Sequence, residues 1–437
     1  DLKILSLKDA KSVIILNNNE QRDIQVLKIC LAINKLTPGE FEHGFSVIVG
    51  MDSQSNMQLL KEVSRNSINP FNIHLLHTKI IAQCCRQSGL SVIYSDLLDF
   101  DGHEIYFLNE QNTVGMSFKD VLMYYKNSMV IGVKNNGNTI IQPPNDYIIK
   151  EGDKLIAIQE DDNVEERSDD IKIDVDCIEV KGSEKDIKQD ILIINWNIDA
   201  PLLIKDLCEY ITEDSKIDVI LDSEGNFDVS NVSNQLDSLS KKVDKVIIGD
   251  VNSIEFLESQ PLADYNSIVI LSETVMADSD VSNKADAKTI ITLLQLRSIK
   301  QKIGIQIPVI SQIQNPQNKE LTDQKSSDDF IVSNQLIGHY TCQLAENPEL
   351  QDVFEEILKP EGSEIYLRDV VDYININSEV NFYTVMEAFV PLNQIPIGYK
   401  VFSEIYDPKH HGIHLNPDKS EYIKFTKDDK IIVLAES

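Results

Sequence analysis

Short apolar runs alternate with amphipathic stretches along the second half of the chain. The runs lack the apolar–polar alternation of a half-exposed strand, and such runs are typical of parallel strands whose two faces are both covered. The expected strands are 191–194, 217–221, 245–248 and 267–271. The helical patterns between them are 199–213, 231–242 and 252–259. This order predicts an α/β fold with a doubly wound parallel sheet.

The two halves of the chain resemble each other. Residues 89–107 (GLSVIYSDLLDFDGHEIYF) align without a gap with residues 349–367 (ELQDVFEEILKPEGSEIYL). Other matches keep the same order, among them the apolar strand 13–16 with the strand 268–271. Self-similarity at so long a period indicates two copies of one structural unit.

Each copy is expected to consist of an α/β lobe, apolar connecting helices and a small α+β lobe with short strands around Gly and Pro turns. The connecting helices are either part of the core or a pair that joins two such domains. The expected segments are the second half of the first α/β lobe at 1–76, connecting helices at 77–100, the first small lobe at 101–160, an acidic linker at 161–188, the second α/β lobe at 189–332, connecting helices at 333–362, and the second small lobe at 363–437.

The first copy has no counterpart to residues 191–250 of the second. Half of a parallel sheet would leave a long strand edge without partners. We therefore expect the missing strands to come from residues upstream or from another chain, which makes the sequence a part of something longer.

Two sets of residues carry a family resemblance. The end of the first small lobe resembles that of the RCK domain, a regulator of K⁺ conductance, at Gly132, Pro144, Asp146, Gly152, Asp153 and Leu155. The segments 1–16, 191–207 and 271–302 are similar to the gating-ring region of the CASTOR/POLLUX family of ion channels. The similarity covers nearly the whole chain.

This resemblance implies tandem RCK domains, each with a Rossmann-like doubly wound parallel sheet and a small α+β C-terminal lobe. It further implies a cytoplasmic regulatory region that senses an ion or small ligand and gates an upstream membrane pore. The expected assembly is a homotetramer whose eight RCK domains form a ring at the cytoplasmic side of a membrane. A peripheral subunit of a potassium transporter, similar to TrkA, is the alternative.

The turn 195–200 bears on nucleotide binding. A dinucleotide site needs a Gly-x-Gly-x-x-Gly turn between the first strand and its helix. The second α/β lobe has Asn195-Trp196-Asn197-Ile198-Asp199-Ala200 there, so we expect no nucleotide in this lobe, and the matching turn of the first copy is absent. No Gly-x-Ser-x-Gly, HExxH or P-loop motif occurs, and no enzymatic activity is expected.

The charge of −31, from 71 acidic and 40 basic residues, disfavours nucleic acid as a partner and attracts cations. Ca²⁺ is the favoured ligand, because it binds several carboxylates from one or two loops. The candidate ligands are Glu273, Asp278, Asp280 and Asp286 after the strand 267–271, and the run Glu160, Asp161 and Asp162. Solvated loops with helix-capping acids explain the same residues equally well.

His74 and His77 are spaced i, i+3 and could share a metal ion. Their neighbours Leu75 and Leu76 favour packing instead.

Overall fold

The structure is a computed structural model, and it contains no ligand. It describes residues 7–15, 22–36, 46–64, 68–109, 111–161, 167–168, 171–181, 188–225, 229–239, 242–273, 279–322, 328–360, 362–407 and 410–436. Within these ranges, no helix has both the length and the apolar character needed to cross a membrane.

The chain divides into two compact units. The first unit comprises 1–88, 187–323 and 328–351, and the second comprises 89–186, 324–327 and 352–437. The division does not follow the tandem order of the repeat. The first unit contains the α/β parts of both copies, and the second unit contains both small lobes.

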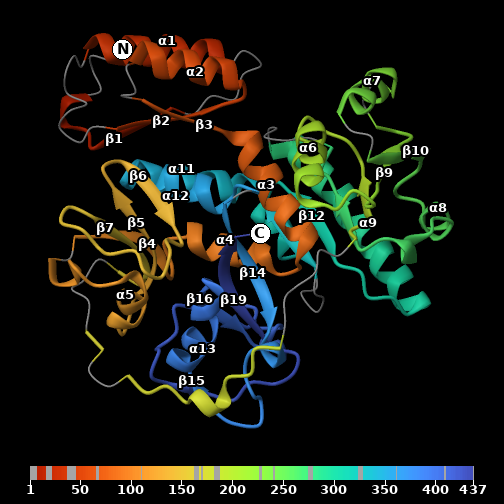
Figure 1. Ribbon diagram of the computed structural model, residues 1–437. Coiled ribbons are helices and arrows are strands. Elements are labelled where there is room, and N and C mark those ends of the chain that lie inside the picture. Colours follow the sequence, from red (N-terminus) through yellow and green to blue (C-terminus); the bar gives the residue numbers. More distant parts are fainter. Residues whose placement is uncertain are drawn as a thin grey trace. The chain divides into compact units, whose positions relative to one another are not determined.

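A six-stranded parallel sheet forms the centre of the first unit (Figure 1). Its strand order is β10-β9-β8-β11-β12-β13, as expected for a doubly wound sheet. The strands are β8 (Ile191–Ile194), β9 (Ile217–Asp222), β10 (Val243–Gly249), β11 (Ser267–Ile270), β12 (Val309–Ile313) and β13 (Asp329–Val332). The helices between them are α6 (Ala200–Tyr210), α7 (Val229–Leu239), α8 (Ile254–Glu258), α9 (Ser279–Ile303) and α10 (Pro316–Lys319). The strands β8 and β11 are buried along their whole length, which explains their uninterrupted apolar sequence.

A three-stranded parallel sheet, in the order β1-β2-β3, also belongs to the first unit. Its elements are β1 (Ser12–Ile15), α1 (Arg22–Leu36), β2 (Ser46–Met51), α2 (Gln54–Ser64) and β3 (Asn69–Asn72). The order matches β11-β12-β13 of the larger sheet, so the internal repeat extends to the topology. Among the described strands, β1 pairs only with β2, whereas its counterpart β11 pairs with both β12 and β8.

Two helices are exchanged between these sheets. The helix α3 (Ile73–Arg86) follows β3 but packs against α6 and contacts β11, β12 and β13 of the larger sheet. The helix α11 (Ser333–Glu346) follows β13 but packs against β1 and β2. Figure 1 shows α1 and α2 on one face of the small sheet and α11 on the other. The connecting helices therefore form part of the core of the first unit.

A buried aspartate is repeated in both sheets. Asp286 of α9 accepts hydrogen bonds from the backbone N–H groups of Gln314 and Asn315 at 2.8 and 2.9 Å. Asp23 of α1 accepts the equivalent bonds from Asp52 and Ser53, each at 3.0 Å. Each aspartate therefore fastens the loop that follows the next strand.

The second unit contains two four-stranded antiparallel sheets with the same topology, β4-β7-β5-β6 and β14-β19-β16-β17. The elements of the first small lobe are β4 (Glu104–Leu108), α5 (Phe118–Tyr124), β5 (Met129–Asn135), β6 (Asn138–Ile141) and β7 (Lys154–Gln159). Those of the second are β14 (Ser363–Asp369), β15 (Val380–Asn381), α13 (Phe382–Phe389), β16 (Ile395–Lys400), β17 (Ile413–Leu415), β18 (Tyr422–Ile423) and β19 (Lys430–Glu436). The short helices α4 (Leu90–Leu98) and α12 (Leu350–Ile357) precede the two lobes.

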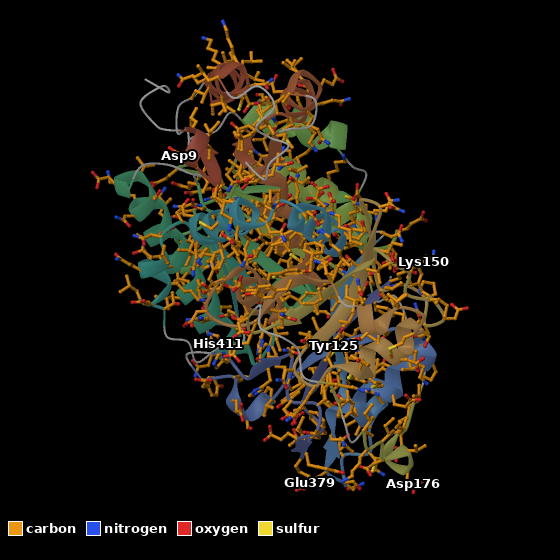
Figure 2. All side chains as sticks on the ribbon, turned by 90° about the vertical axis from the view of Figure 1, so that its left-hand side faces the viewer. Asp9, Tyr125, Lys150, Asp176, Glu379 and His411 are labelled. Carbon is orange, nitrogen blue, oxygen red and sulfur yellow. The ribbon has the colours of Figure 1, made fainter. Side chains whose placement is uncertain are left out.

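Residues 172–181 of the linker lie along the second small lobe. The backbone N–H of Asp174 donates to Thr384 Oγ1 at 2.9 Å, and Asn381 Nδ2 donates to the carbonyl oxygen of Lys172 at 2.9 Å. Figure 2 shows Asp176 of the linker and Glu379 of the lobe at the same end of the molecule. The segment is acidic, as expected, but it is bound to the lobe over residues 172–181.

Candidate functional site

The turn after β8 lies where a dinucleotide would bind in a doubly wound sheet, and its backbone is shaped by asparagines. Asn195 has a positive φ of 76°, a conformation that usually requires glycine. The amide of Asn197 donates to the carbonyl oxygen of Ser272 at 2.7 Å and to Gln312 Oε1 at 2.8 Å. Its side chain thereby ties the turn to the ends of β11 and β12.

The carboxylate of Asp199 lies immediately before α6, where the helix dipole favours a negative charge. His74 Nδ1 lies 2.5 Å from Asp199 Oδ1, and His74 Nε2 lies 3.3 Å from Asp52 Oδ1. His77 Nδ1 lies 3.6 Å from Asp199 Oδ2, while its Nε2 donates to the carbonyl oxygen of Ser333 at 3.2 Å. Two histidines of α3 thus face the one position where a dinucleotide sheet would hold the pyrophosphate.

These contacts shift two pKa values in opposite directions. Burial alone would lower the pKa of His74, but its hydrogen bonds and attraction to Asp199 and Asp52 raise it to about 9. Burial would raise the pKa of Asp199, but hydrogen bonds and charges from His74 and His77 lower it to about 2. Near neutral pH, His74 is therefore a cation between two carboxylates.

Two of the four predicted ligands after β11 have protein partners. The carboxylate of Asp286 is fully buried and accepts the loop hydrogen bonds described above, as well as one from Asn318 Nδ2 at 2.8 Å. Glu273 accepts a hydrogen bond from Lys288 at 2.6 Å. Asp280 is exposed in the first turn of α9, and Asp278 lies outside the described residues.

The other predicted ligands follow β7. Glu160 and Asp161 are exposed, and Asp162 lies outside the described residues. In the part of the chain that the structure describes, no three His, Cys, Asp or Glu side chains are grouped so that they could hold a metal ion.

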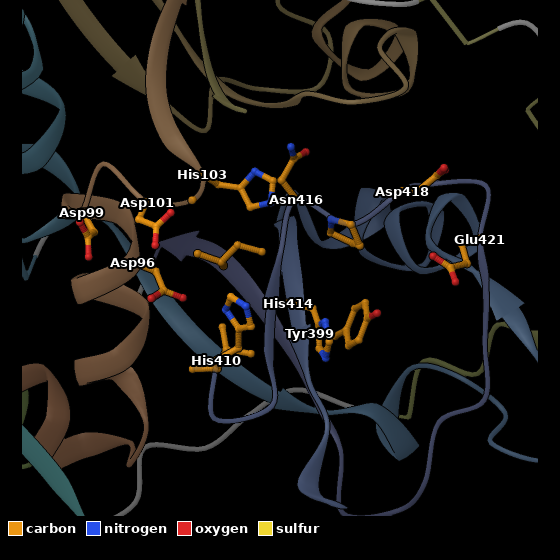
Figure 3. Close-up of a pocket in the computed structure, with 14 residues that line it drawn as sticks. Asp96, Asp99, Asp101, His103, Tyr399, His410, His414, Asn416, Asp418 and Glu421 are labelled. Carbon is orange, nitrogen blue, oxygen red and sulfur yellow. The ribbon is translucent and has the colours of Figure 1, made fainter. Parts of the chain in front are cut away.

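A cavity of about 440 Å³ lies in the second unit (Figure 3). The end of α4 and the loop to β4 supply Asp96, Asp99, Asp101 and His103, and the second small lobe supplies the rest of the lining. These residues are Tyr399, His410, Ile413, His414, Leu415, Asn416, Pro417, Asp418 and Glu421, with Gly102 from the loop to β4. Among the residues that the structure describes, the lining carries five carboxylates and no lysine or arginine.

The histidines of this cavity have different surroundings. Burial lowers the pKa of His103, and the nearby Glu160 opposes that effect. His414 stacks on Tyr399 with 4.8 Å between ring centroids, and its Nε2 lies 2.8 Å from Glu404 Oε2. Glu160 is one of the predicted ligands, and its charge acts on His103, which lines this cavity.

Sequence reasoning did not select Asp96, Asp99 and Asp101. They lie inside the segment 89–107, which sequence reasoning used only as evidence for the internal repeat. Their close spacing in DLLDFD was the available signal, but the second small lobe completes the cavity only in three dimensions. Neither could spacing show that His74 and His77 meet Asp199, which is over 120 residues away.

Comparison with known proteins gives one consistent result. Residues 74–176 match the family model described as "Castor and Pollux, part of voltage-gated ion channel". A probable ion channel POLLUX from Arabidopsis thaliana is 27% identical over 100% of this chain and 56% of its own length. The ion channel CASTOR from Lotus japonicus is 26% identical over 100% of this chain and 54% of its own length.

Solved structures support the fold. The human SLO3 gating ring matches with a TM-score of 0.70 at 15% identity, over 100% of this chain and 89% of that one. A GsuK channel bound to NAD matches with a TM-score of 0.37, which is too low to support an argument about nucleotide binding.

The chain spans about half the length of the curated relatives it matches. Those relatives are named as ion channels and not as enzymes. The chain has the fold of a gating ring and is similar along its whole length to CASTOR and POLLUX ion channels.

Proposed function

We propose that this chain is the ligand-sensing part of a cytoplasmic gating ring, which acts on a cation pore elsewhere in the same protein. The observation that carries the proposal is the agreement with the SLO3 gating ring over the full length of this chain. In this proposal, segments 1–76 and 101–160 belong to one RCK domain, and segments 189–332 and 363–437 belong to the next. Four subunits would then form a ring of eight domains.

Gating by such a ring needs a ligand that binds two ring conformations with different affinity. A difference of a few kcal/mol, spread over several sites, is enough to reverse the populations. We favour Ca²⁺ as the ligand, because the formal charge is −31 and the cavity of the second unit is lined by carboxylates.

The cavity attracts cations through its five carboxylates, but within the described residues no three of them are grouped closely enough to hold an ion. Ca²⁺ takes about six to eight oxygen ligands, many of them carboxylate oxygens. Asp96, Asp99 and Asp101 lie on its rim, and Asp418 and Glu421 lie across from them (Figure 3). Asp286 accepts three hydrogen bonds in the interior, and Asp99 and Asp418 of the cavity also accept hydrogen bonds. We place the ligand at the cavity because of the number of its carboxylates.

Calorimetric titration of the chain with Ca²⁺ tests this proposal, with NADH and ATP titrated separately. We expect heat from Ca²⁺, and a large loss of affinity in the double variant Asp96→Asn/Asp101→Asn. The variant Asp280→Asn is the matched control, because this residue is exposed on α9. If Ca²⁺ gives neither heat nor a change in melting temperature, the Ca²⁺ proposal fails, and heat from NADH or ATP would redirect it to a nucleotide.

A peripheral subunit similar to TrkA remains the alternative function. It would have the same domains and bind a transporter without contributing a pore. The two differ in the gene, where a pore-forming region upstream in the same reading frame supports the channel.

A further inference from the structure

We propose that the contact of α3 with the carboxyl edge of the six-stranded sheet is a proton-sensitive latch, which rising pH weakens. On α3 the latch consists of His74, His77 and Thr78. Their partners are Asp199 at the start of α6, Asp206 within α6, and Asp52 after β2. Its use in gating rests on the proposed function, but its chemistry does not.

The geometry makes the first turn of α3 dependent on one proton. His74 bridges two carboxylates that come from different sheets, Asp52 after β2 and Asp199 after β8. The side chain of Asp199 is fully buried, and that of His74 is only 13% exposed. A buried carboxylate without a cationic partner is costly, so loss of the His74 proton removes the positive charge that balances Asp199, even where the neutral ring still donates from Nδ1.

The surroundings of Asp199 support this reading. Its second oxygen accepts a hydrogen bond from Gln312 Nε2 at 3.3 Å, near the upper limit for such a bond. The ring of His77 is oriented by its bond to the Ser333 carbonyl, and its Nδ1 stays 3.6 Å from the carboxylate. The short contact with His74 is therefore the main interaction that stabilises the charged carboxylate of Asp199.

A second titrating group lies one turn further along the same helix pair. Thr78 Oγ1 donates to Asp206 Oδ2 at 2.6 Å, and Asp206 is 5% exposed. Burial raises the pKa of Asp206 to about 6, and the charge of Glu209 acts in the same direction. The hydrogen bond from Thr78 and the charges of Lys79 and Lys205 lower this pKa and oppose the effect of burial. At the far end of α3, the Cys85 thiol faces Asp329, and burial raises its pKa to about 12, so this thiol stays neutral.

The direction of the pH effect follows from these shifts. The folded state holds the His74 proton more tightly than the unfolded state, so its stabilisation is complete below about pH 6.5 and is lost as pH rises through 9. The folded state also favours the Asp206 proton, so its contribution falls between about pH 4 and 6. Asp199 acts oppositely but only below about pH 4, since its pKa is lowered to about 2. Between pH 6.5 and 9 the contact weakens through His74 alone.

Release of α3 would remove one of the two helices that connect the sheets of the first unit, the other being α11. The helix begins directly after β3 and contacts β11, β12 and β13, so it is a direct connection between the small and the large sheet. A change in its attachment would therefore alter the unit without any other ligand.

The test follows the titration of His74 in the full chain, in EDTA and without added Ca²⁺. Histidine labelled at ¹³Cε1 gives eight resonances, and the signal lost in His74→Gln identifies His74. We expect this signal to titrate near pH 9. We also expect amide exchange in α3, corrected for its intrinsic pH dependence, to speed up roughly tenfold or more between pH 7 and 9.5 in the wild type. In His74→Gln this acceleration should be absent.

Two further variants make the result specific. His414→Gln removes a histidine paired with Glu404 in the second unit and should leave exchange in α3 unchanged. Asp52→Asn changes a partly exposed partner, so the chain should still fold, and the titration of His74 should move toward lower pH. A His74 signal that titrates near pH 6.5, or the same pH-dependent exchange in wild type and His74→Gln, would overturn the latch. Neither result would affect the test with Ca²⁺.

Discussion

Lys419 shows how a single buried side chain can join the two small lobes of the second unit. Its ammonium group donates to the carbonyl oxygens of Leu122, Tyr125 and Ser128 at 3.0, 2.7 and 2.7 Å. The residue is fully buried, although lysine is among the residues least often found there. Three backbone acceptors near the end of α5 are thereby satisfied by a residue that follows β17.

The substitution Lys419→Met should keep the aliphatic packing and remove these three bonds. Buried carbonyl groups without donors cost about 1–3 kcal/mol each, offset in part because the lysine no longer has to be desolvated. We expect a loss of about 3 kcal/mol in the free energy of unfolding, measured by urea denaturation. Lys424→Met is the control, since Lys424 bonds an exposed carbonyl of Asn377, and it should cost less than about 0.5 kcal/mol. Equal losses in both variants would contradict this role.

At the scale of elements, substitution of Asp23 on α1 and Asp286 on α9 can distinguish a structural role from a metal-binding role. Asp286→Asn would place an amide N–H₂ group against N–H donors from the loop after β12. We expect about 2 kcal/mol of destabilisation from it in thermal or urea unfolding, and the same order from Asp23→Asn. Neither change should alter the heat of Ca²⁺ binding. A loss of Ca²⁺ binding in Asp286→Asn with unchanged stability would restore this residue as a ligand.

Much of the element order follows from local pattern. The strand 191–194 has its expected limits, and β9 exceeds the expected strand 217–221 by one residue. Each segment expected to hold connecting helices contains a break between two helices, at 87–89 and at 347–349. Gly89 has a φ of 101°, so the chain reverses there before α4. Both breaks carry turn residues, Gln87-Ser88-Gly89 and Asn347-Pro348-Glu349, so local sequence does contain a signal for them.

The candidate sites were harder to predict than the elements, because sites combine distant segments. The loop carboxylates were chosen for their spacing, yet Asp286 and Glu273 are engaged by protein partners. The cavity depends instead on the packing of residues 96–103 against the second small lobe, and the contact of His74 with Asp199 depends on the packing of α3 against α6. Local sequence holds no information about that pairing.

At the scale of the whole molecule, assembly has to overcome the charge of the chain. Copies with a formal charge of −31 repel one another. At physiological ionic strength, salt screens this repulsion at separations beyond about 8 Å. Apolar side chains remain exposed on the outer helices of the first unit, where they could be buried between copies. They are Ile24 and Leu31 on α1, Leu59 and Val63 on α2, and Ile291 and Leu294 on α9.

A gating-ring subunit should therefore self-associate, and more strongly as ionic strength rises. We expect light scattering to show dimers or larger species at 0.5 M salt, with a smaller share at about 0.05 M. Leu294→Glu should shift the population toward monomer with little change in melting temperature, because the residue is exposed on α9. Ser298→Glu adds the same charge one turn further along the exposed face and should weaken association less, since it removes no apolar contact. A wild-type chain that stays strictly monomeric at high concentration in both salts would count against assembly through this part of the protein.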